Sequence, residues 1–216
     1  MVVLSLVFSS IFRFQIEHYP VYILSGQLVF NFFSEATNTM MGSVVGNAPL
    51  IKKIYVPKYM FPISAMLSSI INVLASFAAL IIVMVFMRVP LHYTMLLSFI
   101  PVVVLAIFAT GVGMILSAVV VKFRDIMHFY SVFLTALMYL MPVIYPMSTL
   151  DAMPVIQTIV AYNPLTMILN MFRDLVMNGT MLDPVTLLIT FVVALAFLGI
   201  GFWVFYRKQD TFIMDI

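Results

Sequence analysis

Four long uncharged stretches dominate this chain of 216 residues and leave few folds open to it. They cover residues 63–87, 93–121, 126–147 and 184–206. A helix needs about 20 apolar residues to cross the hydrocarbon core of a bilayer, and each stretch meets that length. Composition agrees, because 64% of the residues are hydrophobic and only 8% are charged, against about 25% charged residues in soluble domains. The sequence therefore predicts an integral membrane protein.

A fifth predicted span, residues 21–46, is interrupted only by Glu35. We expect helices throughout, because lipid leaves backbone groups without partners in any spanning structure other than a helix or a closed barrel. The alternation of polar and apolar residues that is typical of barrel strands does not occur. Residues 1–12 are apolar but too short to span, so we expect them to form part of a first span. The predicted fold is a single all-α membrane domain over 1–216, a helical bundle of five complete spans plus a partial first span.

The segment before the last span is apolar but broken by prolines. Asp151 can cap a short helix with Pro154 in its first turn, and that helix should stop before Asn163. A second helix is expected with Asn163 as its N-cap, Pro164 in its first turn and Asn178–Gly179 at its end. Neither piece is long enough to cross a bilayer. Residues 148–178 are thus predicted to form a short re-entrant helical hairpin or, alternatively, helices lying at the outer face.

The placement of lysine and arginine predicts the orientation, because short cytoplasmic loops carry an excess of both residues. If the loop at 47–62 is cytoplasmic and the hairpin returns to its own side, seven of the ten basic residues lie inside and three outside. A hairpin that crossed fully would leave five inside, so the bias favours the hairpin and a cytoplasmic C-terminus. The inside set is Lys52, Lys53, Lys58, Lys122, Arg124, Arg207 and Lys208, and the outside set is Arg13, Arg88 and Arg173.

Polar residues recur every three or four positions in the first complete span and so share one helix face. They are Gln27, Asn31, Ser34, Glu35, Asn38 and Gly42. A carboxylate within a span is costly and usually faces a cavity or the bundle interior. This face is predicted either to border a substrate path or a subunit interface, or to supply hydrogen bonds between helices. The candidate path residues are Gln27, Asn31, Glu35, Asn38, Phe129 and Phe133. The two phenylalanine rings either stack on sugar rings or serve in packing alone.

Signatures of catalysis and of metal binding are absent from the sequence. It contains no cysteine, no Gly-rich phosphate loop, no H-E-x-x-H pattern and no nucleophile elbow. The net charge of +2 comes from a few residues that flank the spans, so nucleic-acid binding is not expected. We predict no catalytic residue, no metal site and no cofactor bound by this chain. Gly111, Gly113 and Ser117 instead indicate close helix packing on one face.

The loop between the first two complete spans carries helix signals of its own. Asn47 can cap a short helix with Pro49 in its first turn, and Pro57 ends that helix after about two turns. Its apolar residues could form a ridge while its lysines meet acidic partner groups or lipid phosphates. The ridge residues are Leu50, Ile51 and Ile54, and the lysines are Lys52, Lys53 and Lys58. Alternatively, the loop is a plain cytoplasmic anchor, which explains its lysines but not a helix bounded by prolines.

Seven short motifs follow one another along the chain. They lie at residues 26–33 (GQLVFNFF), 47–57 (NAPLIKKIYVP), Pro62, 123–125 (FRD), 142–146 (PVIYP), 163–166 (NPLT) and 172–173 (FR). This ordered set resembles the polysaccharide-export permeases of the ABC transporter superfamily. The resemblance implies a type 2 exporter half with six spans. It also implies a homodimer that works with two copies of an ATP-binding ABC subunit, which holds ATP and Mg.

In the family that these motifs resemble, the loop matching 47–58 is the cytoplasmic coupling helix seated on the ATPase, and the hairpin matching 148–178 lies near the outer face. The residues expected to couple to the ATPase are Asn47, Pro49, Leu50, Ile51, Lys52, Lys53, Ile54, Tyr55 and Lys58. Phe123, Arg124 and Asp125 are expected at the inner mouth, on the same side.

The sequence leads to one hypothesis and one alternative. The hypothesis is a permease subunit of an ATP-driven exporter that moves a lipid-linked polysaccharide across the bacterial inner membrane. O-antigen, capsular and teichoic acid polymers are the expected substrate types. The alternative is an ion-coupled secondary transporter or a channel that uses Glu35.

Overall fold

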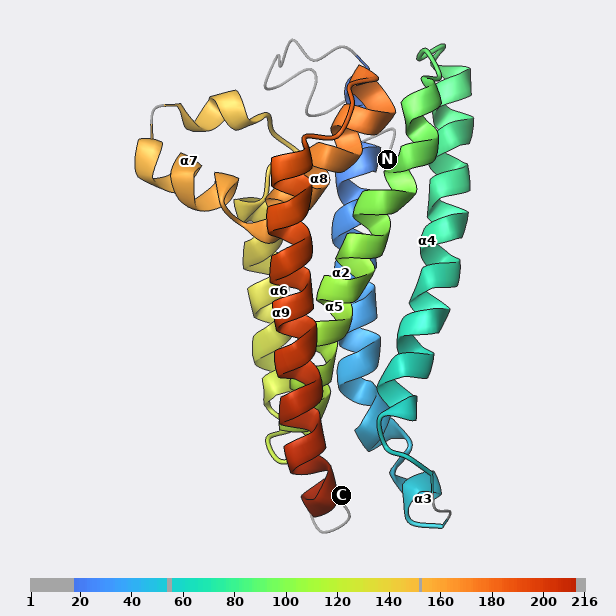
Figure 1. The fold of residues 1–216 in the computed structure, drawn as a ribbon, viewed down its shortest axis with the longest axis vertical. Helices are drawn as coiled ribbons and strands as arrows, with labels where there is room; N and C mark the ends of the chain where they lie inside the picture. The colour runs from blue at the N-terminus through green and yellow to red at the C-terminus, as the bar shows by residue number, and fades with distance from the viewer. Residues whose placement is uncertain (1–17, 54–55, 152, 213–216) are drawn as a thin grey trace. The chain divides into compact units, whose positions relative to one another are not determined.

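The computed structural model describes residues 18–53, 56–151 and 153–212, and all regular elements among them are helical. Figure 1 shows the helices. They are α2 (Tyr19–Gly46), α3 (Ala48–Ile51), α4 (Met60–Phe86), η1 (Tyr93–Ser98), α5 (Phe99–Val120), α6 (Ile126–Leu140), η2 (Met147–Leu150), α7 (Pro154–Ala161), α8 (Pro164–Arg173), η3 (Asp174–Asn178), α9 (Pro184–Lys208) and η4 (Gln209–Thr211). The predicted all-α class is confirmed for these residues. The partial span predicted at 1–12 lies outside them.

Three helical segments of the described residues are long and apolar enough to cross a membrane. They are Met60–Phe86, Tyr93–Val120 and Pro184–Thr211, at three of the predicted spans. At the predicted span 126–147 the helix is shorter than expected, because α6 stops at Leu140 after 15 residues. Pro142 follows closely, and a proline disfavours helical geometry in the residue before it. Helix α2 has 28 residues, but it is not among the three segments. The predicted number of five complete spans is therefore not established.

The two ends of the second hairpin helix follow the sequence prediction. The Asn163 Oδ1 atom accepts a hydrogen bond from the Leu165 amide at 3.0 Å, and Pro164 begins α8. At the other end Gly179 adopts a left-handed conformation with φ of 66° and closes η3, a π-helical turn, as expected for a C-terminal glycine. Helices α7 and α8 with η3 form a pair bent by 77° (Figure 1).

The predicted capping role of Asp151 is wrong. Met153 is the residue that precedes α7, and Pro154 begins the helix. Asp151 instead ends η2, and its Oδ1 atom accepts a hydrogen bond from the Gln157 side chain at 2.8 Å. The Asp151 carboxylate thus binds a side chain of α7 and accepts no capping bond from the free amides in the first turn of that helix.

The chain divides into two compact units. Unit 1 comprises the described residues within Met1–Asn31, Leu74–Val102 and Leu137–Thr190, and unit 2 those within Phe32–Val73, Val103–Ala136 and Phe191–Ile216. All seven basic residues that the sequence analysis assigned to the inside belong to unit 2. The two described residues of the outside set, Arg88 and Arg173, belong to unit 1.

Unit 1 is built around the bent hairpin. The Phe77 ring on α4 packs against Phe172 on α8, with ring centroids 6.1 Å apart, and against Phe99 at 5.3 Å. The buried Thr94 hydroxyl on η1 donates to the Leu175 carbonyl at 2.7 Å. The hairpin is thus fixed by aromatic packing and by a hydrogen bond to the irregular turn of η3.

The last helix, α9, begins in the same unit after Asp183. Hydrogen bonds from the Thr186 hydroxyl and from the Thr186 and Val185 amides hold the pKa of the Asp183 carboxyl below its usual value.

Unit 2 is held together by aromatic packing and by one close backbone crossing. The ring of Phe108 on α5 lies 5.7 Å from Phe33 on α2 and 5.0 Å from Phe197 on α9. A Cβ atom on Gly111 would lie 2.4 Å from the Phe197 backbone, and one on Gly201 would lie 2.4 Å from the Gly111 carbonyl oxygen. Helices α5 and α9 therefore touch along their backbones, which is the geometry that small residues allow.

The sequence prediction that Gly111 and Gly113 share one packing face is wrong. Gly111 faces α9, whereas a Cβ atom on Gly113 would meet the Met40 side chain of α2 at 2.5 Å. Two residues that are two positions apart on a helix point to nearly opposite sides. Both glycines do allow close helix packing, but Gly111 packs against α9 and Gly113 against α2.

The glycine crossing gives a first prediction. Gly111→Ala and Gly201→Ala should each destabilise the protein by about 1–3 kcal/mol, because the added methyl group must push two helices apart. Gly199→Ala is the matched control, since it lies on the same helix as Gly201 and a Cβ atom there meets nothing within 4 Å. We expect this control to be neutral or stabilising by up to about 1 kcal/mol, because alanine favours the helix. Thermal unfolding in detergent checks the series, and equal melting temperatures for all three variants would contradict the crossing.

Candidate functional site

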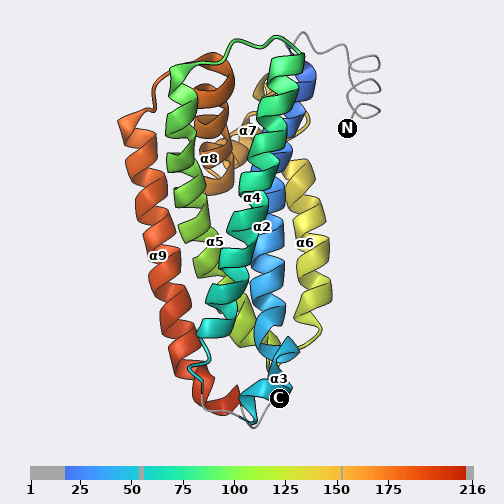
Figure 2. The same cartoon turned by 90° about the vertical axis from the view of Figure 1, so that its right-hand side faces the viewer.

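The predicted coupling segment begins with the short helix α3. Figure 2 shows this turn beyond the C-terminal end of α2, and both belong to unit 2. The described helix is one turn, Ala48–Ile51, with Pro49 in its first turn as predicted. It is shorter than the two turns expected, and Ile54 and Tyr55 lie outside the described residues. Of the two predicted ridge residues that the structure describes, Ile51 is buried and Leu50 is 43% exposed. A partner protein could therefore contact Leu50.

Asn47 takes the predicted N-cap position of α3, and its carbonyl oxygen accepts hydrogen bonds from the Leu50 and Ile51 amides at 3.0 Å. Its side chain makes no capping bond to α3. The Asn47 Nδ2 atom instead donates to the Ser43 carbonyl oxygen at 2.7 Å, where the last turn of α2 leaves carbonyls without helical partners. Asn47 therefore connects the two helices, because its side chain closes α2 and its backbone carbonyl opens α3. It still positions the coupling segment, because it fixes the point at which the chain leaves the long helix.

Lys58 links the coupling segment to the end of α9. Its ammonium group donates to the Gln209 carbonyl oxygen in η4 and lies 5.8 Å from the centre of the Phe212 ring. Phe212 is buried and packs edge to face on Phe205 of α9 at 5.3 Å. A displacement of the loop that carries Lys58 would therefore act directly on the last turns of α9.

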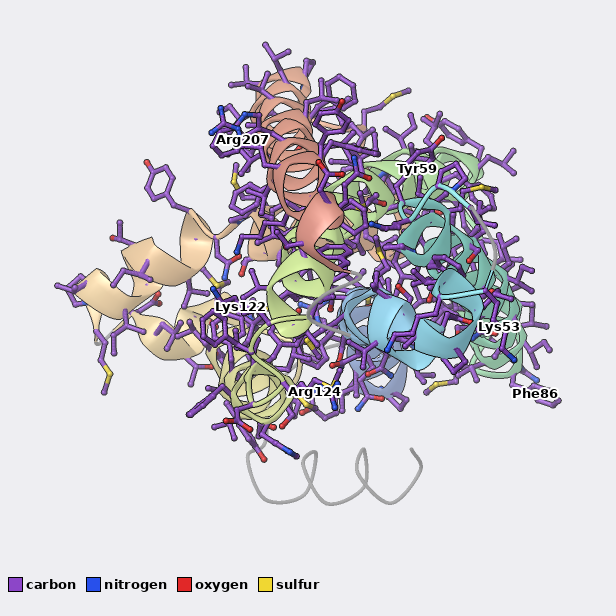
Figure 3. The ribbon with its side chains drawn as sticks, turned by 90° about the horizontal axis from the view of Figure 1, so that it is seen from below. Lys53, Tyr59, Phe86, Lys122, Arg124 and Arg207 are labelled. Atoms are coloured by element: carbon purple, nitrogen blue, oxygen red, sulfur yellow. The ribbon has the colours of Figure 1, made fainter. Side chains whose placement is uncertain are left out.

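Phe123, Arg124 and Asp125, which the sequence analysis predicts at the inner mouth, form an exposed turn between α5 and α6. Phe123 lines a cavity together with Lys122, Lys208 and Phe212. Since Phe212 also lies against Lys58, the predicted inner-mouth turn and the predicted coupling segment meet at the same end of unit 2. Basic side chains at this end come from different elements, and Lys53, Lys122, Arg124 and Arg207 are labelled in Figure 3. Lys52 and Lys53 of the coupling segment are both exposed.

Glu35, the predicted intramembrane carboxylate, has a partner. It accepts a hydrogen bond from the Asn72 side chain of α4, and both residues are exposed. One helical turn further along α2, Thr39 and Ser69 lie with their hydroxyl oxygens 3.3 Å apart. These links join α2 to α4 and favour the interpretation that the polar face supplies hydrogen bonds between helices.

The other candidate path residues differ in their exposure. Gln27 and Asn31 belong to unit 1, where Gln27 is buried and its Oε1 atom has no hydrogen-bond partner, while Asn31 is exposed. In unit 2 Asn38 is half-buried. Phe129 and Phe133 are 73% and 55% exposed on α6. The neighbouring Tyr130 faces inward instead and donates to the Thr37 hydroxyl at 2.7 Å. The two phenylalanines therefore lie on the outer side of α6, available to lipid or to another chain.

Arg173 forms a buried cluster that the sequence did not predict. The residue is 5% exposed, and its guanidinium donates to the carbonyl oxygens of Pro142 at 2.7 Å, Val143 at 2.9 Å and Tyr22 at 3.1 Å. Its Nε atom lies 3.4 Å from the Ser25 hydroxyl, and its central carbon lies 3.6 Å from the centre of the Tyr22 ring. No carboxylate takes part in these contacts. Carbonyl oxygens and an aromatic face solvate the cation in their place.

The tyrosines of α2 complete this cluster around the segment that follows α6. The Tyr22 hydroxyl donates to the Tyr145 carbonyl at 3.0 Å, and the Tyr19 hydroxyl donates to the Ile144 carbonyl at 2.8 Å. Gly26 permits the close approach, because a Cβ atom there would lie 2.6 Å from the Arg173 guanidinium and 2.9 Å from the Val143 oxygen. The carbonyls released where α6 stops are thus satisfied from α2 and α8.

Three of the sequence motifs meet in this cluster. The motif at 26–33 contributes Gly26, the one at 142–146 contributes the free carbonyls, and the one at 172–173 contributes Arg173. The sequence held a signal in the form of an arginine in an apolar segment and a proline-bounded break in a span. It gave no means of pairing the two, because Arg173 lies 31 residues from Pro142 and 30 from Val143 and only the tertiary fold brings them together.

Comparison with known proteins agrees with the motifs. The ABC-2 type transporter family matches residues 1–177. The chain belongs to this family. It is similar to the O-antigen export system permease protein RfbA of Klebsiella pneumoniae, with 29% identity over 180 residues that cover 81% of this chain and 67% of the relative. It is also similar to the protein of the same name from Myxococcus xanthus, with 25% identity over 219 residues that cover 100% of this chain and 83% of the relative.

Membership of the ABC-2 family confirms the resemblance inferred from the seven motifs. It makes the chain a multi-pass membrane subunit of a transporter, in agreement with the prediction that the chain is not itself an enzyme.

The Arg173 cluster gives a second prediction. Arg173→Lys keeps the charge but cannot donate in a fork to the Pro142 and Val143 carbonyls, so we expect destabilisation of about 1–3 kcal/mol for each carbonyl left without a donor. Gly26→Ala should also destabilise, through the clash with the guanidinium. Arg88→Lys is the control, because Arg88 is an exposed arginine of the same unit. Thermal unfolding of the purified permease measures all three, and an Arg173→Lys variant as stable as Arg88→Lys would contradict the cluster.

Proposed function

We propose that this chain is the permease subunit of an ATP-driven exporter that moves a lipid-linked polysaccharide across the bacterial inner membrane. The similarity to O-antigen export permeases over 81–100% of the chain carries the proposal. Membership of the ABC-2 family implies an ATP-binding ABC subunit as partner. In the proposed complex two permease copies form a homodimer with two copies of that subunit, which binds ATP and Mg while this chain binds no cofactor.

The proposed docking surface for the ATP-binding subunit is the coupling segment at 47–58. Exposed Leu50, Lys52 and Lys53 would contact the partner, with the lysines meeting acidic groups there. The concentration of basic residues in unit 2 supports a cytoplasmic location for this end and for the C-terminus. The hairpin at 148–178 would then belong to the outer part of the protein.

Movement of the ATP-binding subunits would reach the membrane domain through two contacts of the coupling segment. Ile51 is buried, so it would carry movement of α3 into the packed part of unit 2. Lys58 holds the Gln209 carbonyl, so it would carry the same movement to the end of α9. Closure of the ATP-binding subunits around ATP would thereby shift α9 and, through the glycine crossing, α5. The path would lie between the two permease copies, bordered by the exposed rings of Phe129 and Phe133 on α6.

A third prediction tests the docking surface by site-specific crosslinking. The chain has no cysteine, so a cysteine introduced at Lys53 is unique and can carry a maleimide-benzophenone crosslinker. In membranes that contain the complete permease and its ATP-binding subunit, the Lys53→Cys variant should crosslink to that subunit. Tyr93→Cys is the control, because Tyr93 is 73% exposed but belongs to unit 1, and it should not crosslink. A permease that neither crosslinks from position 53 nor retains the subunit during purification would exclude the proposal.

A fourth prediction separates the exporter from an ion-coupled carrier that uses Glu35. Glu35→Gln should leave polysaccharide export nearly unchanged, because the glutamine carbonyl oxygen can accept the same hydrogen bond from Asn72. Export is measured as the polymer that reaches the outer surface of cells whose own permease is deleted. Inactivation of the ATP-binding subunit is the matched control and should abolish export. The carrier would be favoured instead if Glu35→Gln stopped transport while inactivation of the ATP-binding subunit had no effect.

A further inference from the structure

A cavity of about 400 Å³ lies at the end of unit 2, where α5 and α9 finish. Its lining combines basic and apolar side chains. The lining residues are Ala118, Val121, Lys122, Phe123, Lys208, Thr211 and Phe212. No acidic residue is among these described lining residues. Both lysines are exposed, and Lys122 lies with its ammonium group 5.8 Å from the centre of the Phe123 ring.

Lys122 and Lys208 lie at the ends of two apolar helices, α5 and α9. Helix α5 finishes at Val120, just before Lys122, and Lys208 is the last residue of α9. Both helices belong to segments that are long and apolar enough to cross a membrane. One turn before the end of α9, Trp203 and Tyr206 are 58% and 74% exposed. Exposed tryptophan and tyrosine near the end of a spanning helix mark the level of the lipid headgroups.

Arg207 provides a second sign of this level. Its guanidinium carbon lies 4.7 Å from the centre of the Trp203 ring, so the cation lies along the exposed aromatic side of α9 rather than pointing away from it. Long basic side chains adopt this arrangement where an apolar surface meets charged headgroups. Both signs indicate that the end of α9, where the cavity lies, is at the level of the lipid headgroups.

We propose that this cavity binds an anionic phospholipid of the surrounding leaflet. Lys122 and Lys208 would hold the phosphate, and the part of an acyl chain nearest the headgroup would lie against Phe123, which is 54% exposed. The charges complement each other, because two ammonium groups face a ligand with net negative charge and the lining supplies no competing carboxylate. The combination of two cations with apolar and aromatic walls fits an amphiphile better than a free inorganic ion, which would leave the apolar wall in water.

The bound lipid would join two elements that the proposed function uses. Lys122 belongs to the turn between α5 and α6, whereas Lys208 leads into η4, which holds Lys58. Phe212 contacts both the cavity and Lys58. A lipid phosphate between the two lysines would therefore hold the inner-mouth turn against the C-terminal segment. The binding itself rests on the cavity alone and does not depend on which substrate is transported.

The experiment measures lipid binding to the complete permease. The protein is purified in a neutral detergent, titrated with phosphatidylglycerol or with phosphatidylcholine, and analysed by native mass spectrometry. The double variant K122Q/K208Q should lose phosphatidylglycerol affinity by about 25-fold, since one basic residue near an anionic membrane surface contributes about fivefold. Phosphatidylcholine binding should not change. K52Q/K53Q is the matched control, because it removes the same charge from exposed lysines of unit 2 that do not line the cavity.

Each remaining outcome decides against the proposal. Equal loss of phosphatidylglycerol in K122Q/K208Q and K52Q/K53Q would show diffuse attraction to basic residues and no site. Displacement of the lipid by millimolar inorganic phosphate would assign the lysines to a soluble phosphate. The ATP-binding subunit is also co-expressed with each variant, and a K122Q/K208Q permease that keeps its lipid but no longer co-purifies with that subunit would assign the cavity to that partner. Melting temperatures in lipid-free detergent are compared for both double variants, so that a loss of fold is not counted as a loss of lipid.

Discussion

The requirement that every buried backbone group must find a partner governs this structure, and Arg173 is where that requirement is hardest to meet. The end of α6 at Leu140 leaves the carbonyls of Pro142 and Val143 without helical amides. A membrane domain has little water to satisfy them. The Arg173 guanidinium donates to both carbonyls and in return gains partners for its own charge. Neither the broken span nor the buried cation would be stable alone, so each one explains the presence of the other.

The same principle appears in unit 2 in a different form. Packing between apolar helices brings little hydrophobic gain in lipid, so hydrogen bonds and close backbone contact decide which helices associate. Glu35 with Asn72 and Thr37 with Tyr130 connect α2 to α4 and to α6. The contact at Gly111 connects α5 to α9. In unit 2 a few polar residues and one glycine contact therefore determine which helices become neighbours.

The sequence predicted those parts of the fold that depend on neighbouring residues. The ends of α8 and η3 followed from Asn163 and Gly179, because an N-cap oxygen and a left-handed glycine act within one turn. Asp151 had the right chemistry for a cap, but Met153 takes the N-cap position of α7 and the Asp151 carboxylate accepts from the Gln157 side chain. Asn47 takes its predicted N-cap position, but its side chain donates to the Ser43 carbonyl oxygen and makes no capping bond. The Arg173 cluster was out of reach, since it depends on residues that only the tertiary fold brings together.

The proposed docking surface and the proposed lipid site share one structural element, and this has a thermodynamic consequence. Phe212 lines the cavity and lies against Lys58, whose ammonium group holds the Gln209 carbonyl. If occupation of the cavity changes the affinity of the coupling segment for the ATP-binding subunit, binding of that subunit must change the affinity for lipid by the same factor. The coupling energy would be carried by the packing of one buried ring. Nucleotide-dependent docking would then alter which lipids are held at the end of α9, and the lipid composition of the membrane would in turn set how firmly the ATP-binding subunit is held.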